Sequence, residues 1–269
     1  MYICIDIGGT KTLVARLTNE GVVSESVKFP TPKDYDEFLS ALKQAVSNFK
    51  DQEFRAGTVA VPGSVDRKKE IGILLPNLGW KNLPRLKDIE RITQCPMVIE
   101  NDAKLAGLSE SMLLKGKFSR VLYVTVSTGI GVGLTVDGHI DTSVSDGGGH
   151  TILVEHKGKL TPWEDFASGK AIVKKYGKQA SEIHDPATWR AIARNLAPGF
   201  LELIAVLEPQ VIVVGGGAGH YLERFQEFLV ADLEKYETPM MKIPPILPAQ
   251  RPDEAVIYGC YDYAQQKFA

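Results

Sequence analysis

The feature that most constrains this chain is a strand, a glycine-containing turn and a second strand that occur in this order twice. The two copies occupy residues 2–7, 8–10 and 12–17, and residues 121–126, 127–129 and 131–136. A further turn follows each copy, and Asp137-Gly138 in the second copy is typical of a two-residue hairpin turn. Two hairpins of the same design indicate an internal duplication.

Strand and helix patterns alternate through the rest of the chain. Apolar strands are predicted at 57–61, 97–99 and 211–214, whereas residues 71–80 read as irregular. Helical spacing of apolar residues predicts helices from about 34 to 49, at 84–93, 103–114 and 186–207, from the glycine run 215–219 to about 235, and at 255–267. Pro198 predicts a kink or a break in the longest of these helices. A polar break at 115–117 separates the two duplicated halves.

Composition excludes several classes of protein. The formal net charge is −2 and the isoelectric point is near 6.2, so no global basic field favours nucleic acid. No apolar stretch approaches the roughly 20 residues of a membrane-spanning helix, and the N-terminus is a poor secretion signal. Cys4, Cys95 and Cys260 are scattered, which predicts neither disulfides nor a cysteine zinc site and fits a reducing cytoplasm.

Three glycine-rich turns follow strands and could bind phosphate groups through their backbone N–H groups. They are Gly8-Gly9-Thr10-Lys11, Ser127-Thr128-Gly129 and the run 215–219. The first two lead into strands, which speaks against a P-loop or a dinucleotide-binding fingerprint, and the third lacks the last glycine of that fingerprint. Each turn taken alone is better explained as a tight hairpin that binds nothing.

Two acidic residues are candidates for chemistry. Asp6 ends the first strand and could hold Mg²⁺ through water, although it could also cap a turn. Asp102 lies at a strand-to-helix junction, where a carboxylate can act as a general base or cap the helix. The residues alone leave both alternatives open.

Taken in order, four motifs resemble the ROK (repressor, ORF, kinase) family of bacterial sugar kinases. They are Asp6-Ile7-Gly8-Gly9-Thr10-Lys11-Thr12, Glu100-Asn101-Asp102, Ser127-Thr128-Gly129-Ile130-Gly131-Val132-Gly133, and Val214-Gly215-Gly216-Gly217. The resemblance implies an α/β fold of two duplicated actin-like (ribonuclease H-like) lobes, with mixed sheets, flanking helices and a cleft between the lobes. It implies an N-terminal lobe of residues 1–116 plus 255–269 and a C-terminal lobe of residues 117–254.

The resemblance also implies roles for individual residues. Asp102 would be the general base that receives a sugar hydroxyl proton, and Asp6 would organise Mg²⁺. The expected nucleotide-binding residues, with ATP as donor, are Asp6, Gly8, Gly9, Thr10, Lys11, Thr128, Gly129, Gly216 and Gly217. The expected sugar-binding residues are Asn77, Asn101, Asp102, His150 and Glu164.

The segment around residue 147 departs from the family pattern. Gly147 stands where the family usually carries a Glu, and the cysteine cluster of the family's zinc hairpin is absent. We therefore expect no structural zinc. His150 and Glu164 remain sugar-site candidates, with a loop histidine bonded to backbone and an acid in a helix's first turn as the alternatives. The missing acceptor at Gly147 puts the usual glucose preference in doubt.

The function expected from these residues is phosphoryl transfer from ATP to a hydroxyl of a hexose or hexosamine. Polyphosphate remains open as the donor. The alternatives are a catalytically weak sugar-binding regulator and an ATPase of the same superfamily. The expected partners are a monosaccharide and a second copy of the chain, with no nucleic acid and no membrane, and the expected compartment is the cytoplasm.

Overall fold

The chain folds into two compact units. The computed structural model describes residues 1–75, 78–251 and 253–268. Unit 1 contains Met1–Ser109 and Glu254–Ala269, and unit 2 contains Glu110–Asp253. The chain passes from one unit to the other inside helix α3 (Asp102–Leu113), ahead of the polar break at 115–117 that marked the expected boundary.

Unit 1 is built on a five-stranded mixed sheet in the order β3-β2-β1-β4-β8. Its strands are β1 (Tyr2–Ile7), β2 (Lys11–Leu17), β3 (Val23–Pro30), β4 (Ala56–Val61) and β8 (Met97–Asn101). The first three form an antiparallel meander, whereas β1, β4 and β8 run parallel. Every residue of the central strand β4 is buried, as expected for a strand covered on both faces.

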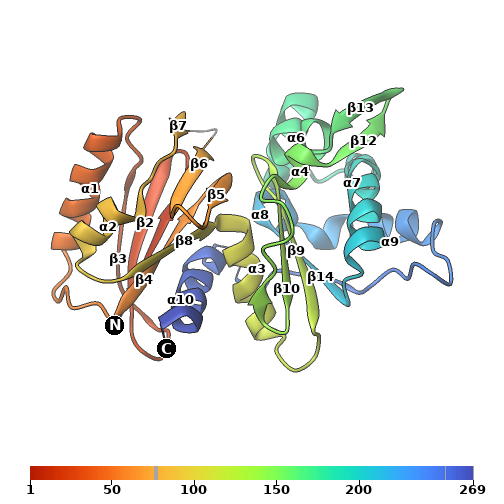
Figure 1. The fold of residues 1–269 in the computed structure, drawn as a ribbon. Coiled ribbons are helices and arrows are strands. Elements are labelled where there is room, and N and C mark those ends of the chain that lie inside the picture. Colours follow the sequence, from red (N-terminus) through yellow and green to blue (C-terminus); the bar gives the residue numbers. More distant parts are fainter. Residues whose placement is uncertain (76–77, 252, 269) are drawn as a thin grey trace. The chain divides into compact units, whose positions relative to one another are not determined.

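Helices hold this sheet in place (Figure 1). Helix α1 (Tyr35–Ser47) begins at Asp34, whose carboxylate accepts the N–H groups of Asp36 and Glu37 and so caps the helix. Helix α10 (Ala255–Phe268) packs on β1 and β4. A Cβ at Gly259 of α10 would lie 1.9 Å from the Leu105 carbonyl oxygen of α3, so only glycine allows these two backbones to approach this closely.

A small second sheet belongs to unit 1 and corrects the sequence prediction. Residues 71–80 read as irregular, but the structure forms β5 (Ser64–Asp66), β6 (Ile71–Leu75) and β7 (Trp80–Lys81) there and just before. The Trp80 indole, which is buried, donates to the Lys33 carbonyl at 2.7 Å. Lys33 and Trp80 are 47 residues apart in the sequence, so local periodicity could not reveal their contact. Helix α2 (Leu86–Thr93) follows the small sheet.

Unit 2 repeats the strand order of unit 1 and confirms the duplication. Its main sheet has the order β11-β10-β9-β14-β15. The strands are β9 (Arg120–Val126), β10 (Ile130–Val136), β11 (His139–Ile140), β14 (Val211–Gly215) and β15 (Ile246–Pro248). Asp137 and Gly138 have φ angles of 50° and 76°, as the predicted hairpin turn requires. Antiparallel hairpin strands and parallel strands take the same places as in unit 1.

The helices of unit 2 differ from the sequence prediction at two places. Helix α7 (Pro186–Leu207) continues through Pro198, so a break there is wrong. The buried Trp163 ring lies against Gly199, and its indole donates to the Asn195 carbonyl at 3.2 Å, which fixes this stretch of helix by tertiary contacts. The single helix expected from the glycine run to about residue 235 is also wrong.

The chain instead forms three short helices after β14. They are α8 (Gly216–Gly219), η2 (Leu222–Arg224) and α9 (Gln226–Glu234). The interruption lets Leu222 and Phe225 both enter the core, where Phe225 stacks on Trp189 with ring centroids 5.5 Å apart. Burial of two large side chains outweighs continuity of the helix.

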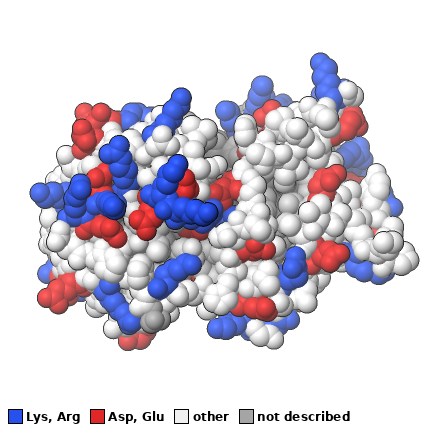
Figure 2. All heavy atoms as spheres, in the orientation of Figure 1, with Lys and Arg blue, Asp and Glu red and all other residues white. Residues whose placement is uncertain are grey.

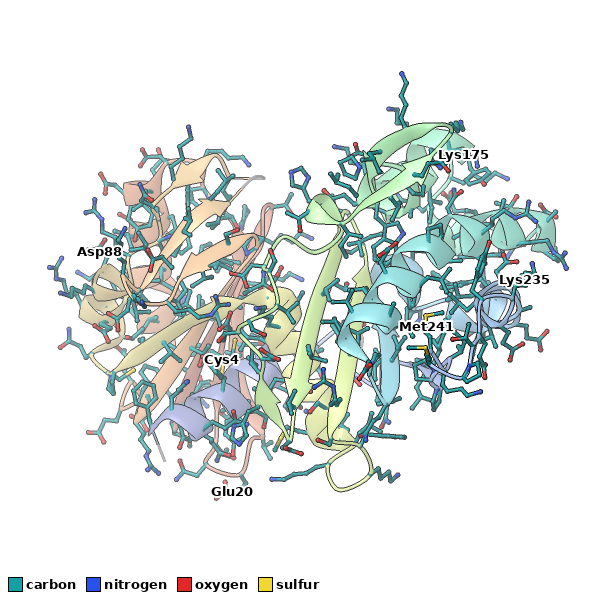
Figure 3. All side chains as sticks on the ribbon, turned by 45° about the vertical axis from the view of Figure 1, so that its right-hand side comes forward. Cys4, Glu20, Asp88, Lys175, Lys235 and Met241 are labelled. Carbon is teal, nitrogen blue, oxygen red and sulfur yellow. The ribbon has the colours of Figure 1, made fainter. Side chains whose placement is uncertain are left out.

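Short elements connect β11 to α7 in unit 2. They are α4 (Gly148–Thr151), the hairpin strands β12 (Leu153–His156) and β13 (Lys159–Pro162), α5 (Glu164–Ala167), α6 (Gly169–Tyr176) and η1 (Ala180–Glu182). His156 stacks on Phe166 with centroids 4.0 Å apart, which fastens the β12–β13 hairpin to α5. Lys175 marks α6 in Figure 3.

Two observations concern the surface. In the described part of the chain, no helix has the length and apolar character needed to cross a membrane. On the face drawn in Figure 2, Lys and Arg side chains are interspersed with Asp and Glu side chains over both units.

Candidate functional site

The carboxyl ends of three parallel strands form one edge of the unit 1 sheet. Asp6 of β1 pairs with Ala60 of β4, and Ala60 pairs with Glu100 of β8. Asp102 comes two residues later, at the first residue of α3. The structure thus places both acids singled out from the sequence, Asp6 and Asp102, at the same edge of one sheet, where ligands of α/β proteins commonly bind.

Asp6 has a strongly raised pKa. The pKa of Asp6 is raised from 3.8 to about 7, chiefly by burial of its carboxyl and also by the negative charge of Asp102, while Lys28 opposes both effects. Two carboxyl groups held close together disfavour the doubly charged state. A divalent cation would reverse this effect, and carboxylate oxygens are the ligands that Mg²⁺ prefers. The donor set at Asp6 therefore fits Mg²⁺.

Asn101, the residue before Asp102, caps the first turn of helix α3. The Asn101 Oδ1 accepts the Lys104 N–H at 3.1 Å, and its Nδ2 donates to the Gly63 carbonyl at 2.9 Å. Asn101 is buried, so both ends of its amide have protein partners. Asp102 is partly exposed, and its Oδ1 accepts the adjacent Ala103 N–H at 2.7 Å. The capping role belongs to Asn101, and the Asp102 carboxylate is not needed for it.

The first glycine turn is held by contacts that leave its tip exposed. The Gly8 N–H donates to the Lys11 carbonyl at 3.0 Å, and a Cβ at Gly8 would lie 2.7 Å from that oxygen. The Thr31 hydroxyl donates to the Gly8 carbonyl at 2.8 Å. Gly9 is partly exposed, and Thr10 and Lys11 are exposed. Thr31 was missed by the sequence analysis, because its contact with the turn spans 23 residues.

The second and third glycine turns border one pocket inside unit 2. This cavity of about 700 Å³ is lined by residues of both turns, Thr128 and Gly217 among them, and by Lys170 and Tyr221. The second turn is closed by the Ser127 N–H, which donates to the Gly129 carbonyl at 2.9 Å. A pocket of this size, with small residues at one side, can accept a nucleoside.

Gly216 enters α8 in a conformation that other residues rarely adopt. Its φ is 82°, and a Cβ there would lie 2.4 Å from the Thr125 hydroxyl oxygen. A Cβ at Gly217, by contrast, would meet nothing within 4 Å. Gly216 is therefore required by the turn itself, whereas Gly217 leaves open space beside the pocket.

His150 and Glu164, two expected sugar-binding residues, are brought together. The His150 Nδ1 lies 3.2 Å from Glu164 Oε1, and Glu164 Oε2 accepts the Ile130 N–H at 3.2 Å. A Cβ at Gly129 would lie 2.7 Å from the Glu164 carboxylate, so the second turn and this acid are in contact. His150 is bonded to a carboxylate rather than to backbone, and its side chain is 73% exposed.

Gly147 has no side-chain acceptor, and the Thr151 side chain fills the space that a side chain at residue 147 would occupy. A Cβ at Gly147 would lie 2.3 Å from the Thr151 side chain. A Glu at this position would require Thr151 to move. The backbone and the Thr151 side chain around residue 147 are therefore arranged for a glycine and leave no room for an acidic side chain.

Metal sites made of several side chains are not found among residues 1–75, 78–251 and 253–268, where no group of three or more His, Cys, Asp or Glu could hold an ion. Asn77, an expected sugar-binding residue, lies outside the described residues.

Comparison with known proteins identifies the family. The sequence pattern of the ROK family matches residues 2–267. The chain belongs to the ROK family. The N-acetylmannosamine kinase of Salmonella typhi is 30% identical over 268 residues, covering 87% of this ROK protein and 90% of the relative. The glucokinase of Streptomyces coelicolor is 27% identical over 261 residues, covering 81% and 82%.

A solved structure supports the fold of this ROK protein. The ROK glucokinase of Streptomyces griseus, crystallised with glucose and AMPPNP, superposes with a TM-score of 0.83. It covers 98% of this chain and 99% of its own, at 23% sequence identity. At this identity the likeness shows the fold, which confirms the expected actin-like ATPase architecture of mixed sheets flanked by helices. The two relatives named above are sugar kinases by name.

Proposed function

We propose that this ROK protein transfers the γ-phosphoryl group of ATP to a hydroxyl of a hexose or hexosamine, with Asp102 as general base. The observation that carries the proposal is the state of Asp102. It is partly exposed at the carboxyl edge of the β1–β4–β8 sheet, while Asn101 caps the helix that it begins. A partly exposed carboxylate at the start of a helix that the preceding residue caps is suited to accept a hydroxyl proton.

Each unit carries candidate substrate-binding residues of its own. In unit 1, the Gly8–Lys11 turn would bind the phosphate chain through backbone N–H groups, and Asp6 would hold Mg²⁺ through water. Mg²⁺ neutralises charge on the transferring group. In unit 2, the pocket beside Thr128 and Gly217 would take the nucleoside. Gly129 and Gly216 would shape the turns around it.

The acceptor sugar would be bound by polar side chains that can exchange hydrogen bonds with hydroxyl groups. His150 and Glu164 form one such pair, and Asn101 keeps a second amide proton and a second lone pair beyond its two protein bonds. Sugar kinases among the relatives support this acceptor class. Asp102 would then take the proton of the attacking hydroxyl as the phosphoryl group is transferred.

A screen of ADP release across hexoses and N-acetylated hexosamines, with ATP and Mg²⁺, tests the proposal. We expect release that depends on one or a few sugars, and a loss of about 10²–10⁴-fold in kcat for Asp102→Asn, with sugar KM within a few-fold. Release without any sugar would instead indicate an ATPase. Sugar binding with no release would indicate a regulator, and full turnover by Asp102→Asn would remove the base assignment.

A further inference from the structure

Glu100, the residue before Asn101, carries a deeply buried carboxylate. It is 0% exposed at the end of β8. The Arg67 guanidinium donates a hydrogen bond to each oxygen of the Glu100 carboxylate. Its Nε donates to Oε2 at 2.8 Å, and its Nη2 donates to Oε1. A two-bond fork of this kind fixes geometry as well as charge. The side chains of Arg67 and Glu100 therefore behave as one rigid group.

Two further donors complete the environment of this carboxylate. The Asn101 N–H donates to Glu100 Oε1 at 2.7 Å, and the Tyr263 hydroxyl of α10 donates to Oε2 at 3.5 Å. The first of these bonds holds the backbone of the residue that precedes Asp102. The orientation of the Glu100 carboxylate and the path of the chain into α3 are thus linked directly.

The same strand end is attached a second time to the segment that carries Arg67. Arg67 follows β5, and the Gly63 carbonyl just before β5 accepts the Asn101 amide at 2.9 Å. Strands β5 and β6 pair, and β6 pairs with β7. Residues on either side of β5 in the small sheet of unit 1 therefore contact Glu100 and Asn101, the two residues before Asp102. Arg67 does so through an ion pair and Gly63 through a neutral hydrogen bond.

We propose that Arg67 is a positioning residue that acts through Glu100 to hold the Asp102 carboxylate where it can accept the sugar proton. The inference rests on the proposed function. Arg67 itself touches neither phosphate nor sugar in this scheme. Its consequence is that disturbance of the small β5–β6–β7 sheet is transmitted to the placement of the general base.

A purely structural ion pair would behave differently on mutation. Removing only Arg67 leaves a buried, uncompensated carboxylate, which destabilises a protein strongly. Removing both charges, in Arg67→Met/Glu100→Gln, leaves no such charge. If the pair serves stability alone, the double variant recovers both stability and turnover. If it serves position, the double variant recovers stability and turnover stays low.

The experiment compares four full-length variants with the wild type: Arg67→Met, Arg67→Lys, Arg67→Met/Glu100→Gln, and the control Arg91→Met. Arg91 forms an exposed ion pair with Asp88 in the same unit, at 3.1 Å. We expect Arg67→Met to lower both the unfolding midpoint and kcat. The double variant and Arg67→Lys should unfold near the wild-type midpoint, with kcat still about 10–100-fold low and both KM values within a few-fold.

The outcomes separate this inference from the proposed function. Wild-type ADP release with sugar, together with full kcat in the double variant, would overturn the positioning role of Arg67 and leave the kinase proposal intact. Absence of sugar-dependent release by the wild type would end the kinase proposal. Hydrogen exchange of the backbone amides of residues 97–105 then tests whether Arg67 fixes the chain at the start of α3. Faster exchange in the double variant, but not in Arg91→Met, supports this role of Arg67. Unchanged exchange in the double variant overturns it.

Discussion

Replacing Asp6 by Asn should make the protein more stable in the absence of Mg²⁺ and nucleotide. The folded chain holds the Asp6 carboxyl in a partly buried place, where the charge of Asp102 also acts on it, with a pKa of about 7 against an ordinary value of 3.8. An acid whose pKa is raised by folding destabilises the fold when it ionises. An amide has the same shape, carries no charge and removes that cost.

The size and the pH range of the effect follow from these two values. The difference between 3.8 and about 7 corresponds to about 4 kcal/mol, at roughly 1.4 kcal/mol per pH unit. The wild-type protein loses stability as the pH rises from about 4 to about 7, and the full loss is present above that range. The gain from Asp6→Asn should therefore approach about 4 kcal/mol at pH 8 and fall to less than half of this at pH 5.

Thermal unfolding of wild type and Asp6→Asn at pH 5 and pH 8, without Mg²⁺ or nucleotide, measures this difference. At about 2–4 °C per kcal/mol, the unfolding midpoint of the variant should be at least about 8 °C higher at pH 8. Asp36→Asn makes the same chemical change at an exposed position of unit 1 and should shift the midpoint little at either pH. A gain that is equal at the two pH values, or absent at pH 8, would refute the argument from burial and charge.

The remaining predictions concern unit 2. Gly216→Ala should destabilise the protein by about 1–3 kcal/mol because of its positive φ, whereas Gly217→Ala should change stability little, and thermal unfolding of both variants compares the two sites. Gly199→Ala places a Cβ 2.1 Å from the Trp163 ring and should cost about 1–3 kcal/mol by overpacking; an unchanged unfolding midpoint and tryptophan spectrum would contradict the close packing described. Glu164→Gln weakens the pair with His150 and should raise the sugar KM several-fold, with a smaller effect on kcat; steady-state kinetics with the sugar varied would show the reverse if Glu164 acted in the chemical step.

Local patterns were sufficient to predict most of the sheet strands and long helices. The duplicated hairpins were recognisable because their turns have short-range signatures, such as Asp137-Gly138. The helix that begins at Tyr35 was recognisable from the helical spacing of its apolar residues. The small β5–β6–β7 sheet and the break after α8 were missed, because tertiary packing of Trp80 and Phe225 decides them and no local periodicity records it.

The acidic residues of the candidate site could be predicted from the sequence, but the residues that hold them in place could not. Asp6 and Asp102 stand at strand ends in the sequence, so their meeting at one sheet edge follows from parallel pairing. Sequence alone could not decide whether Asp102 is a cap, because that depends on the bonds of Asn101. The clamp on Glu100 was also hidden, since Arg67 is 33 residues away and nothing near Arg67 indicates its partner.

The contact of α10 with β1 and β4 has a consequence for the order of events during synthesis. Most of unit 1 precedes unit 2 in the chain, yet unit 1 is completed by Ala255–Phe268, which are made after the whole of unit 2. Domains that fold during translation usually do so from the N-terminus onward. Here unit 2 can fold first, while the sheet that bears Asp6 keeps an apolar face uncovered until α10 has been synthesised.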